Sequence, residues 1–120
     1  MNGKRILVIE DEFLIALEIV SALEAAGFGD VEQVDNQEDA LRRVGEETWD
    51  GIVADANLNG ASIERIATLM KQRSIPFVVV TGYGKETLPT SVGDAPVIEK
   101  PFSWPHLAQT LIRTIGSGGC

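Results

Sequence analysis

The sequence predicts a single α/β domain built on a parallel β-sheet. Between residues 4 and 115, short apolar runs of strand length alternate with segments whose apolar residues recur at helical spacing. This alternation is typical of successive β-α-β units. At 120 residues and 44% hydrophobic content, the chain is long enough to bury one core. Right-handed crossovers would bring the C-terminal ends of all strands to one edge of the sheet.

Five apolar runs predict the strands. They cover residues 6–9, 31–34, 52–55, 77–81 and 97–99, and the second is the weakest. Between the first two strands, Gly27 is a suitable terminator for a helix because its backbone can adopt positive φ. The predicted buried stripe of that helix consists of Phe13, Leu14, Leu17, Val20, Ala22 and Leu23.

The remaining helices are predicted from caps and apolar spacing. Asn36 is a suitable N-cap for a second helix and Ser103 for the last one. The residues expected to face the core are Ala40, Leu41 and Val44, then Ile63, Ile66, Ala67 and Met70, and finally Leu107, Leu111, Ile112 and Ile115. Residues 84–93 are a poor helix because Pro89 interrupts them, so we expect a short helical turn or a mobile loop there.

Composition narrows the function classes. A net charge of −8 and a pI near 4.5 argue against direct nucleic-acid binding, which needs clustered Lys and Arg. No apolar stretch approaches the roughly 20 residues that cross a bilayer, so membrane insertion is not expected. With Cys120 as the only cysteine and no signal pattern, we expect a cytoplasmic protein. The predicted domain covers residues 1–115, and residues 116–120 are expected to be a flexible tail, native or the remnant of an added linker.

Polar residues follow four of the predicted strands. Glu10 and Asp11 come after the first, Asp55 ends the third, Thr81 ends the fourth and Lys100 follows the fifth. The C-terminal edge of a parallel sheet is where open α/β folds bind ligands. We therefore expect these side chains to converge in one pocket, although each alone could be an ordinary surface residue.

Clustered carboxylates repel one another, and a hard divalent cation relieves that cost. Mg²⁺ accepts a few carboxylates, a backbone carbonyl and retained waters. We predict Asp11 and Asp55 as direct ligands, the carbonyl of Asn57 as a third, and Glu10 acting through water. The Asp55 carboxylate could attack phosphorus to form an acyl phosphate. Thr81 and Lys100, held by the rigid Pro101, would then contact the phosphoryl oxygens.

These residues give the chain its resemblance to a known family. Glu10-Asp11, Asp55, Thr81 and Lys100-Pro101-Phe102, each after a strand, make it resemble a response-regulator receiver domain of two-component signalling over residues 4–115. The resemblance implies a flavodoxin-like (CheY-like) three-layer sandwich with strand order 2-1-3-4-5. It also implies that Asp55 is the phosphoacceptor, that Glu10 and Asp11 serve Mg²⁺, that Thr81 is the switch hydroxyl, and that Lys100 pairs with the phosphate.

One position departs from the family pattern. Receiver domains usually carry Tyr or Phe three residues before the lysine, where this chain has Val97. Tyr83 is a possible substitute for that switch aromatic, or simply an aromatic beside the site. The run from Pro76 to Tyr83 resembles a subgroup with a Pro-Phe…Thr-Gly-Tyr pattern that is often paired with HWE-type histidine kinases.

Three functions follow as competing hypotheses. The first is a switch that takes a phosphoryl group from a histidine kinase or phosphotransfer protein onto Asp55 and changes contacts with a downstream protein target. The second is a docking module of the same fold that acts without phosphorylation. The third, an aspartyl-nucleophile phosphatase, is disfavoured because Asn57 stands where such enzymes carry a second carboxylate. We therefore predict a phosphoacceptor rather than a turnover enzyme.

Overall fold

A computed structural model of the chain describes residues 3–82, 88–99 and 103–118. Its central feature is a five-stranded parallel sheet in the order β2-β1-β3-β6-β7. The strands are β1 (Arg5–Ile9), β2 (Asp30–Val34), β3 (Gly51–Asp55), β6 (Phe77–Thr81) and β7 (Val97–Glu99). The predicted fold class, strand order and strand positions are thus confirmed, with bounds shifted by one residue at most.

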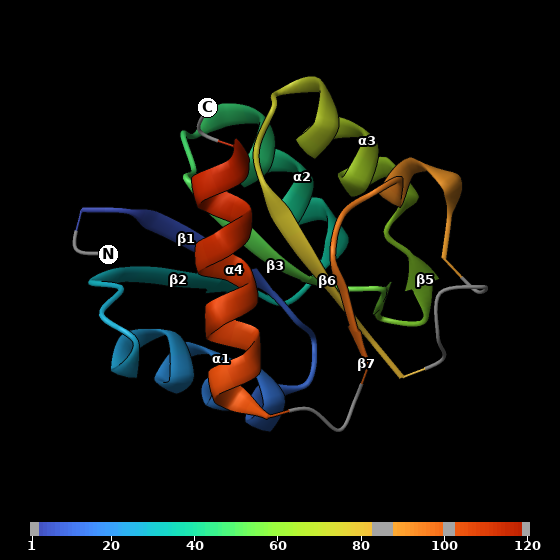
Figure 1. Cartoon of the computed structure of the whole chain (residues 1–120). Coiled ribbons are helices and arrows are strands. Elements are labelled where there is room, and N and C mark those ends of the chain that lie inside the picture. Colours follow the sequence, from blue (N-terminus) through green and yellow to red (C-terminus); the bar gives the residue numbers. More distant parts are fainter. Residues whose placement is uncertain (1–2, 83–87, 100–102, 119–120) are drawn as a thin grey trace.

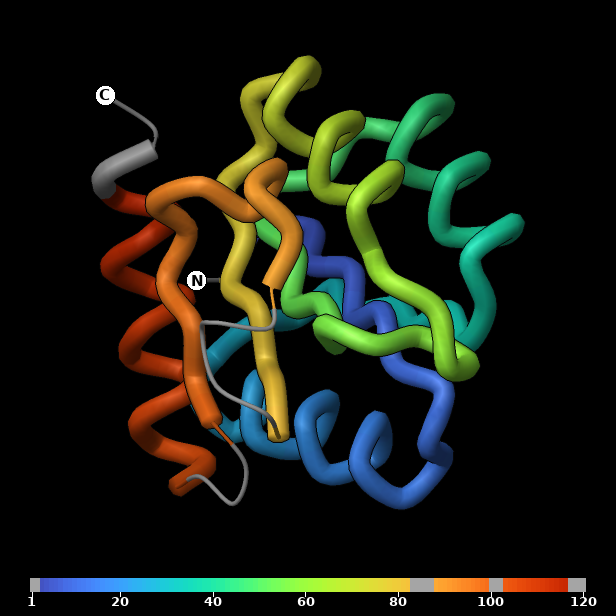
Figure 2. Tube along the Cα trace, turned by 90° about the vertical axis from the view of Figure 1, so that its right-hand side faces the viewer, coloured from blue at the N-terminus to red at the C-terminus, as the bar shows by residue number. Residues whose placement is uncertain are grey.

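Two pairs of helices cover the sheet. The pair α1 (Phe13–Ala25) and α4 (Trp104–Gly118) lies on one face, and the pair α2 (Gln37–Glu46) and α3 (Glu64–Gln72) lies on the other (Figure 1). Figure 2 shows the same three layers after a turn of 90°. Residues alternate between faces along β1, so that Leu7 and Ile9 pack toward α2 and α3 while Ile6 and Val8 pack toward α1 and α4. β3 and β6 are buried along their whole length, as expected for central parallel strands.

The predicted helix caps are present. The Asn36 side chain accepts a hydrogen bond from the Asp39 backbone N–H at 2.8 Å, and the Ser103 hydroxyl accepts one from the His106 N–H at 3.1 Å. Gly27 adopts φ 104° just after α1, as predicted for its terminator.

The predicted inward face of α1 is wrong in the first half of the helix, whereas Leu23 is buried and Val20 packs against the core as predicted. Phe13, Leu14 and Leu17 are 69%, 70% and 49% exposed. The buried residues are Ala16, Ile19 and Leu23. The first half of this helix is apolar on nearly every side, so periodicity alone does not choose between the two stripes.

Two segments differ from the expected outline in detail. Where a short helical turn or loop was expected, over residues 84–93, the described part from residue 88 contains a 3-10 turn, η2 (Thr90–Val92), directly after Pro89. Helix α4 continues to Gly118, three residues past the expected domain end at 115. Glycine lowers helix propensity by only about 1 kcal/mol per residue, which a helix end tolerates. Residues 116–118 are therefore helical, whereas a flexible tail was expected.

A small antiparallel hairpin follows β3 and was not predicted. β4 (Asn57–Leu58) pairs with β5 (Ala61–Ser62) around the two-residue turn Asn59-Gly60. These turn residues have φ values of 56° and 79°, the positive values that a type I′ turn requires. Among the residues that the structure describes, no helix is both long and apolar enough to cross a membrane.

Candidate functional site

Three strand ends meet at one edge of the sheet. β3 ends at Asp55, which pairs with Val80, and β6 ends one residue later at Thr81. On the other side of β3, the backbone of Glu10 still follows β2, because its N–H donates to the Val34 carbonyl at 3.1 Å. The parallel register therefore delivers the predicted acids and the hydroxyl to the same rim.

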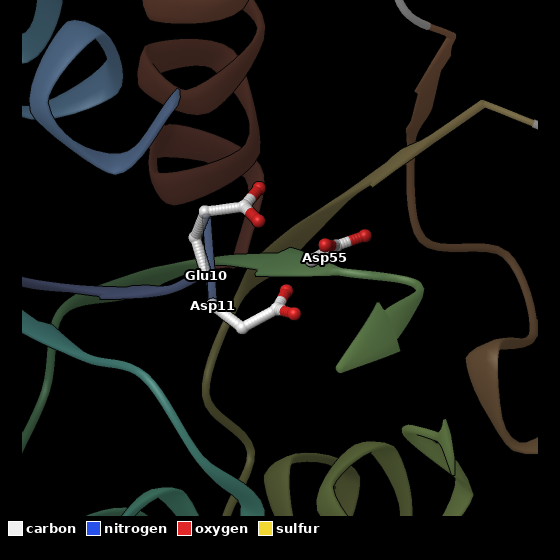
Figure 3. A group of neighbouring side chains, drawn as sticks. All are labelled: Glu10, Asp11 and Asp55. Carbon is white, nitrogen blue, oxygen red and sulfur yellow. The ribbon is translucent and has the colours of Figure 1, made fainter. Parts of the chain in front are cut away.

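The three acids form a compact group. One carboxylate oxygen from each of Glu10, Asp11 and Asp55 lies within 4.8 Å of the other two. Figure 3 shows these carboxylates around a common space, with Glu10 and Asp11 following β1 and Asp55 at the end of β3. Glu10 and Asp55 are only 1% and 8% exposed, and Asp11 is half-buried. Gathering partly desolvated carboxylates is costly unless a cation or hydrogen bonds compensate.

The donor set fits a magnesium ion. Oxygens on opposite sides of Mg²⁺ lie about 4.2 Å apart, because each sits about 2.0–2.1 Å from the metal. The observed spread of 4.8 Å is close to that value and needs only small side-chain movements. All the ligands are hard oxygens, as Mg²⁺ prefers, and some of them are exposed enough to leave room for retained water. Their assignment as ligands stays a prediction.

Local hydrogen bonds shape the two acidic turns. The Glu12 backbone N–H donates to Glu10 Oε2 at 3.1 Å, which curls the chain between β1 and α1. In the same way, the Asn57 N–H donates to Asp55 Oδ1 at 3.2 Å, directly after β3. Each carboxylate thus accepts a backbone hydrogen bond from two residues ahead, an Asx-type arrangement that fixes the turn.

A pocket of about 590 Å³ opens over these residues. Its walls include the acids, the end of β6 and the hairpin turn, and the lining residues are Asp11, Glu12, Asp55, Asn57, Gly60, Thr81 and Gly82. Glu12, Gly60 and Gly82 were not singled out from the sequence. The Asn59-Gly60 pair is a known hairpin signal and could have drawn attention to Gly60.

The structure describes only some of the residues that were predicted to act as the switch or to contact the phosphate. Thr81 is 1% exposed and pairs with Glu99 of β7, the residue directly before Lys100 in the sequence. Lys100, Pro101 and Tyr83 lie outside the described residues. Val97 pairs with Val79 and is partly buried, beside a 210 Å³ hollow that it lines together with Leu88, Pro89, Thr90, Val92 and Gly93.

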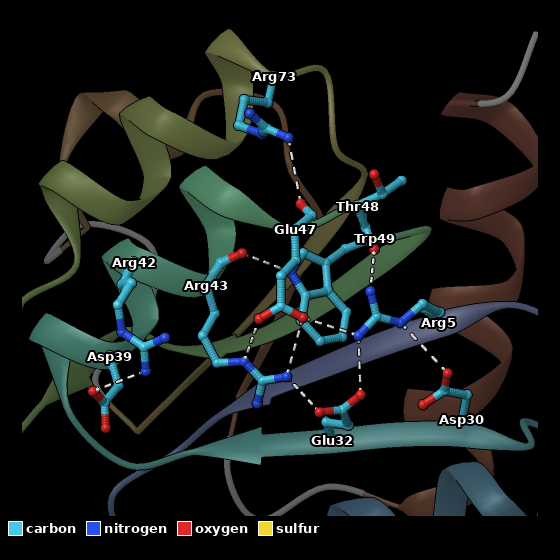
Figure 4. A network of polar contacts seen from close by, with 10 residues as sticks. All are labelled: Arg5, Asp30, Glu32, Asp39, Arg42, Arg43, Glu47, Thr48, Trp49 and Arg73. Atoms are coloured by element: carbon cyan, nitrogen blue, oxygen red, sulfur yellow. Dashed lines mark hydrogen bonds and ion pairs between the residues drawn. The ribbon is translucent and has the colours of Figure 1, made fainter.

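A second polar cluster lies at the opposite, N-terminal edge of the sheet (Figure 4). The guanidinium carbons of Arg5 and Arg43 lie 4.2 and 5.2 Å from the centre of the Trp49 ring. Trp49 Nε1 donates to the Arg43 carbonyl at 3.0 Å. Both arginines also pair with Glu32 and Glu47. No local sequence pattern connects Trp49 to these charged residues.

The same contacts shift the pKa values of the charged side chains in the cluster. Hydrogen bonds from Arg43 and then Arg5 lower the pKa of Glu47 to about 2 and also lower the pKa of Glu32. The carboxylates in turn raise the pKa of both guanidinium groups. Away from this cluster, Asn36 and then Arg42 lower the pKa of Asp39 at the start of α2. The cluster links β1, β2 and the end of α2 far from the pocket, which indicates a structural role.

Comparison with known proteins identifies the family. The profile of the response regulator receiver domain matches residues 6–112. The chain belongs to this family. Among curated relatives, the phosphate regulon transcriptional regulatory protein PhoB of Klebsiella pneumoniae is 37% identical over 84% of this receiver domain and 47% of that protein. PhoB of Pseudomonas aeruginosa is 33% identical over 98% of this chain and 56% of that protein. The receiver domain therefore spans about half the length of these relatives.

Solved structures share the fold of this chain. SdrG from Sphingomonas melonis Fr1 superimposes with a TM-score of 0.79 at 33% identity, over 93% of this chain and 95% of that chain. The receiver domain of the sensor histidine kinase PA1611 from Pseudomonas aeruginosa PAO1 has a TM-score of 0.83 at 24% identity, over 95% and 98%. That structure holds a magnesium ion in its own active site cleft. At this identity it supports the shared fold.

Proposed function

We propose that this receiver domain takes a phosphoryl group onto Asp55 from a histidine kinase or a phosphotransfer protein, with Mg²⁺, and thereby changes its contacts with a downstream protein. The observation that carries the proposal is the grouping of Glu10, Asp11 and Asp55, with Asp55 nearly buried beneath an open pocket. A phosphoryl donor can enter this pocket from solvent, and the acceptor carboxylate is held at the end of a rigid strand.

The transfer is a displacement at phosphorus. An oxygen of the Asp55 carboxylate attacks the phosphorus of a phosphohistidine, and the P–N bond breaks. The electron pair of that bond stays on the imidazole nitrogen, which the donor site reprotonates. Hydrolysis reverses the state of the domain, because water attacks the same phosphorus and returns a carboxylate and inorganic phosphate. Bound Mg²⁺ would offset negative charge on the carboxylates and on the transferring group.

Side chains of the chain itself complete the proposed site. The Asn57 N–H already donates to Asp55 Oδ1 and so orients the carboxylate. Thr81 ends the neighbouring strand, and we assign its hydroxyl to a hydrogen bond with a phosphoryl oxygen. We assign Lys100 to a second phosphoryl oxygen on the basis of the sequence. Asn57 has no titratable side chain, so we expect slow release of phosphate rather than catalytic turnover.

The exposed apolar face of α1 supports a protein donor. Phe13, Leu14 and Leu17 expose much of their side chains directly after Glu12, which lines the pocket. Exposed aromatic and aliphatic side chains grouped beside a site mark protein contacts. A donor that packs on this face would bring its phosphohistidine to the pocket mouth. We name Phe13, Leu14 and Leu17 the α1 patch.

The output side of the proposal is a protein contact. The PhoB relatives are transcriptional regulators by name, and the matched part is about half of each. This acidic domain, with a net charge of −8, is not suited to bind nucleic acid itself. We therefore propose that phosphorylation alters binding to a protein or to another domain. A cytoplasmic location, where histidine kinases present their phosphoryl group, is part of the same proposal.

Incubation with acetyl phosphate tests the proposal without a cognate kinase. With Mg²⁺, intact-protein mass should show one added phosphoryl group, and chelation of the metal should abolish the gain. Asp11→Asn should slow the gain, because a metal ligand is lost, whereas Asp94→Asn, an exposed acid outside the pocket, should not. If the wild-type domain stays unmodified at saturating donor and Mg²⁺, the docking-module alternative replaces the proposal. Steady hydrolysis of a phosphate monoester would instead favour the phosphatase.

A further inference from the structure

The hairpin after β3 forms one wall of the pocket. Asn57 begins β4 and Gly60 lies in its turn, and both line the cavity over the acids. The pairing is short, with Asn57 opposite Ser62 and Leu58 opposite Ala61. A pair of two-residue strands has too few hydrogen bonds to be stable on its own. Other contacts must therefore hold this wall in place.

Pairing geometry directs the Asn57 backbone toward the acids. In an antiparallel pair, the residues beside a two-residue turn exchange both hydrogen bonds, and the next opposed pair exchanges none. Leu58 and Ala61 are the inner pair, so the backbone groups of Asn57 point away from β5. The Asn57 N–H indeed donates to Asp55 Oδ1. An extended residue carries its N–H and C=O on the same side, which turns the Asn57 carbonyl to the side of Asp55.

Two side-chain hydrogen bonds fasten the hairpin to the segment before and at the start of α2. Asn59 Nδ2 donates to the Asp35 carbonyl at 3.1 Å, which ties down the turn. Gln37 Nε2 donates to the Ser62 carbonyl at 2.9 Å, which ties down the far strand. Ser62 is also held from the other side, since its hydroxyl accepts the Glu64 N–H at 3.1 Å at the start of α3.

We propose that Asn59 and Gln37 are positioning residues for the metal site, because they hold the hairpin that aims the Asn57 carbonyl. This inference rests on the proposed function, in which that carbonyl is a magnesium ligand. Neither residue is among those that line the pocket. They act through the β4–β5 pairing. Because the hairpin is tied to the start of α2, the position of that helix fixes the position of Asn57.

Two substitutions remove the hydrogen bonds and leave charge and turn unchanged. Asn59→Gly keeps a residue that adopts φ near 56° but has no side-chain donor. Gln37→Met keeps the length of the side chain and likewise cannot donate. Gln109→Met, at an exposed position on α4, is the matched control. Urea unfolding of each variant confirms that the fold is retained.

Amide NMR during a Mg²⁺ titration is the measurement. We expect Asn59→Gly and Gln37→Met to weaken Mg²⁺ affinity about threefold to tenfold each, the effect of one lost hydrogen bond. Gln109→Met should match wild type. The amides of Leu58 and Ala61 should also exchange faster with solvent in the two variants. At saturating Mg²⁺, acetyl phosphate should modify them at the wild-type rate, because only metal occupancy has changed.

The outcomes separate this inference from the proposed function. Wild-type Mg²⁺ affinity in both variants would overturn the positioning role, even with faster hairpin exchange, and leave the proposed function intact. A slower reaction at saturating Mg²⁺ with unchanged affinity would overturn it as well. If the wild-type domain shows no response to Mg²⁺ at Asp11 and Asp55, both the inference and the metal assignment fail.

Discussion

Asp55 and Thr81 end two adjacent parallel strands one residue apart in register, since Asp55 pairs with Val80. Both side chains are buried, at 8% and 1% exposure, and both line the same pocket. The end of β6 therefore lies directly beside the Asp55 carboxylate. Thr81 in turn pairs with Glu99 of β7. This register connects Asp55 through Thr81 to β7 at the edge of the sheet.

The first prediction concerns Thr81. Thr81→Ala should still accept a phosphoryl group on Asp55, because the nucleophile and the acids remain. It should lose most of the phosphorylation-dependent amide shifts in β7 and η2, because no hydroxyl follows the phosphoryl group. Thr81→Ser, which keeps the hydroxyl, should retain them. Equal shifts in Thr81→Ala and wild type would show that Thr81 does not carry the response.

A second prediction addresses the α1 patch. Leu14→Ser should slow transfer from a phosphorylated histidine phosphotransfer protein about tenfold, because a loss of about 1.4 kcal/mol is expected if Leu14 lies at the centre of the contact. Its reaction with acetyl phosphate should equal that of wild type, because the small donor makes no contact with α1. Rapid-quench kinetics with both donors checks this. Identical slowing with acetyl phosphate would locate the defect in the pocket and remove the docking role.

Acid stability should depend on the cluster around Trp49. The folded pKa of Glu47 is about 2, below the ordinary 4.5 of an unfolded chain, because Arg43 and Arg5 hydrogen-bond the carboxylate. The unfolded state then binds more protons, so the free energy of unfolding falls as pH drops from about 4.5 to about 2. Urea unfolding across this range should show a shallower pH dependence for Glu47→Gln. Glu46→Gln, at an exposed neighbour, is the control, and parallel profiles for both variants would contradict the assignment.

Two glycines should respond to alanine in opposite directions. A Cβ at Gly51 would meet Ile115 Cδ1 at 2.9 Å, so Gly51→Ala should destabilise the fold by about 1–3 kcal/mol through overpacking of α4 on β3. A Cβ at Gly45 would meet only Leu69 Cδ2, at 3.7 Å. Because Gly45 lies in α2, Gly45→Ala should stabilise by about 0.4–1 kcal/mol. Chemical denaturation measures both, and a neutral Gly51→Ala would show that α4 can shift.

The central strands β3 and β6 were predictable because they are buried along their whole length and read as continuous apolar runs. The edge strand β7 also matches its predicted bounds, although only Ile98 of its three residues is buried. Because the strands are parallel, their C-terminal ends lie at the same edge of the sheet, and this places Glu10, Asp55 and Thr81 there. The inward face of the first half of α1 was not predictable, because apolar residues surround its first turns and three of them, Phe13, Leu14 and Leu17, are exposed.

The other features that the sequence did not predict depend on contacts between residues that are far apart in the chain. Arg5 forms hydrogen bonds with Glu32 and Glu47, which lie 27 and 42 residues away, and no local sequence pattern predicts such pairs. The hairpin did carry a local signal in Asn59-Gly60. Its anchors, Asp35 and Gln37, come from a different turn, so its role as a pocket wall needed the structure.

Chemical mapping of the phosphorylated residue tests the central claim most directly. The domain is treated with acetyl phosphate and Mg²⁺, and borohydride then reduces the acyl phosphate, which converts an aspartyl phosphate into homoserine. Peptide sequencing by mass spectrometry should find homoserine at position 55 alone, and none in Asp55→Asn. Homoserine at position 11, or a reduced glutamyl product at position 10, would contradict the assignment of Asp55 as the acceptor.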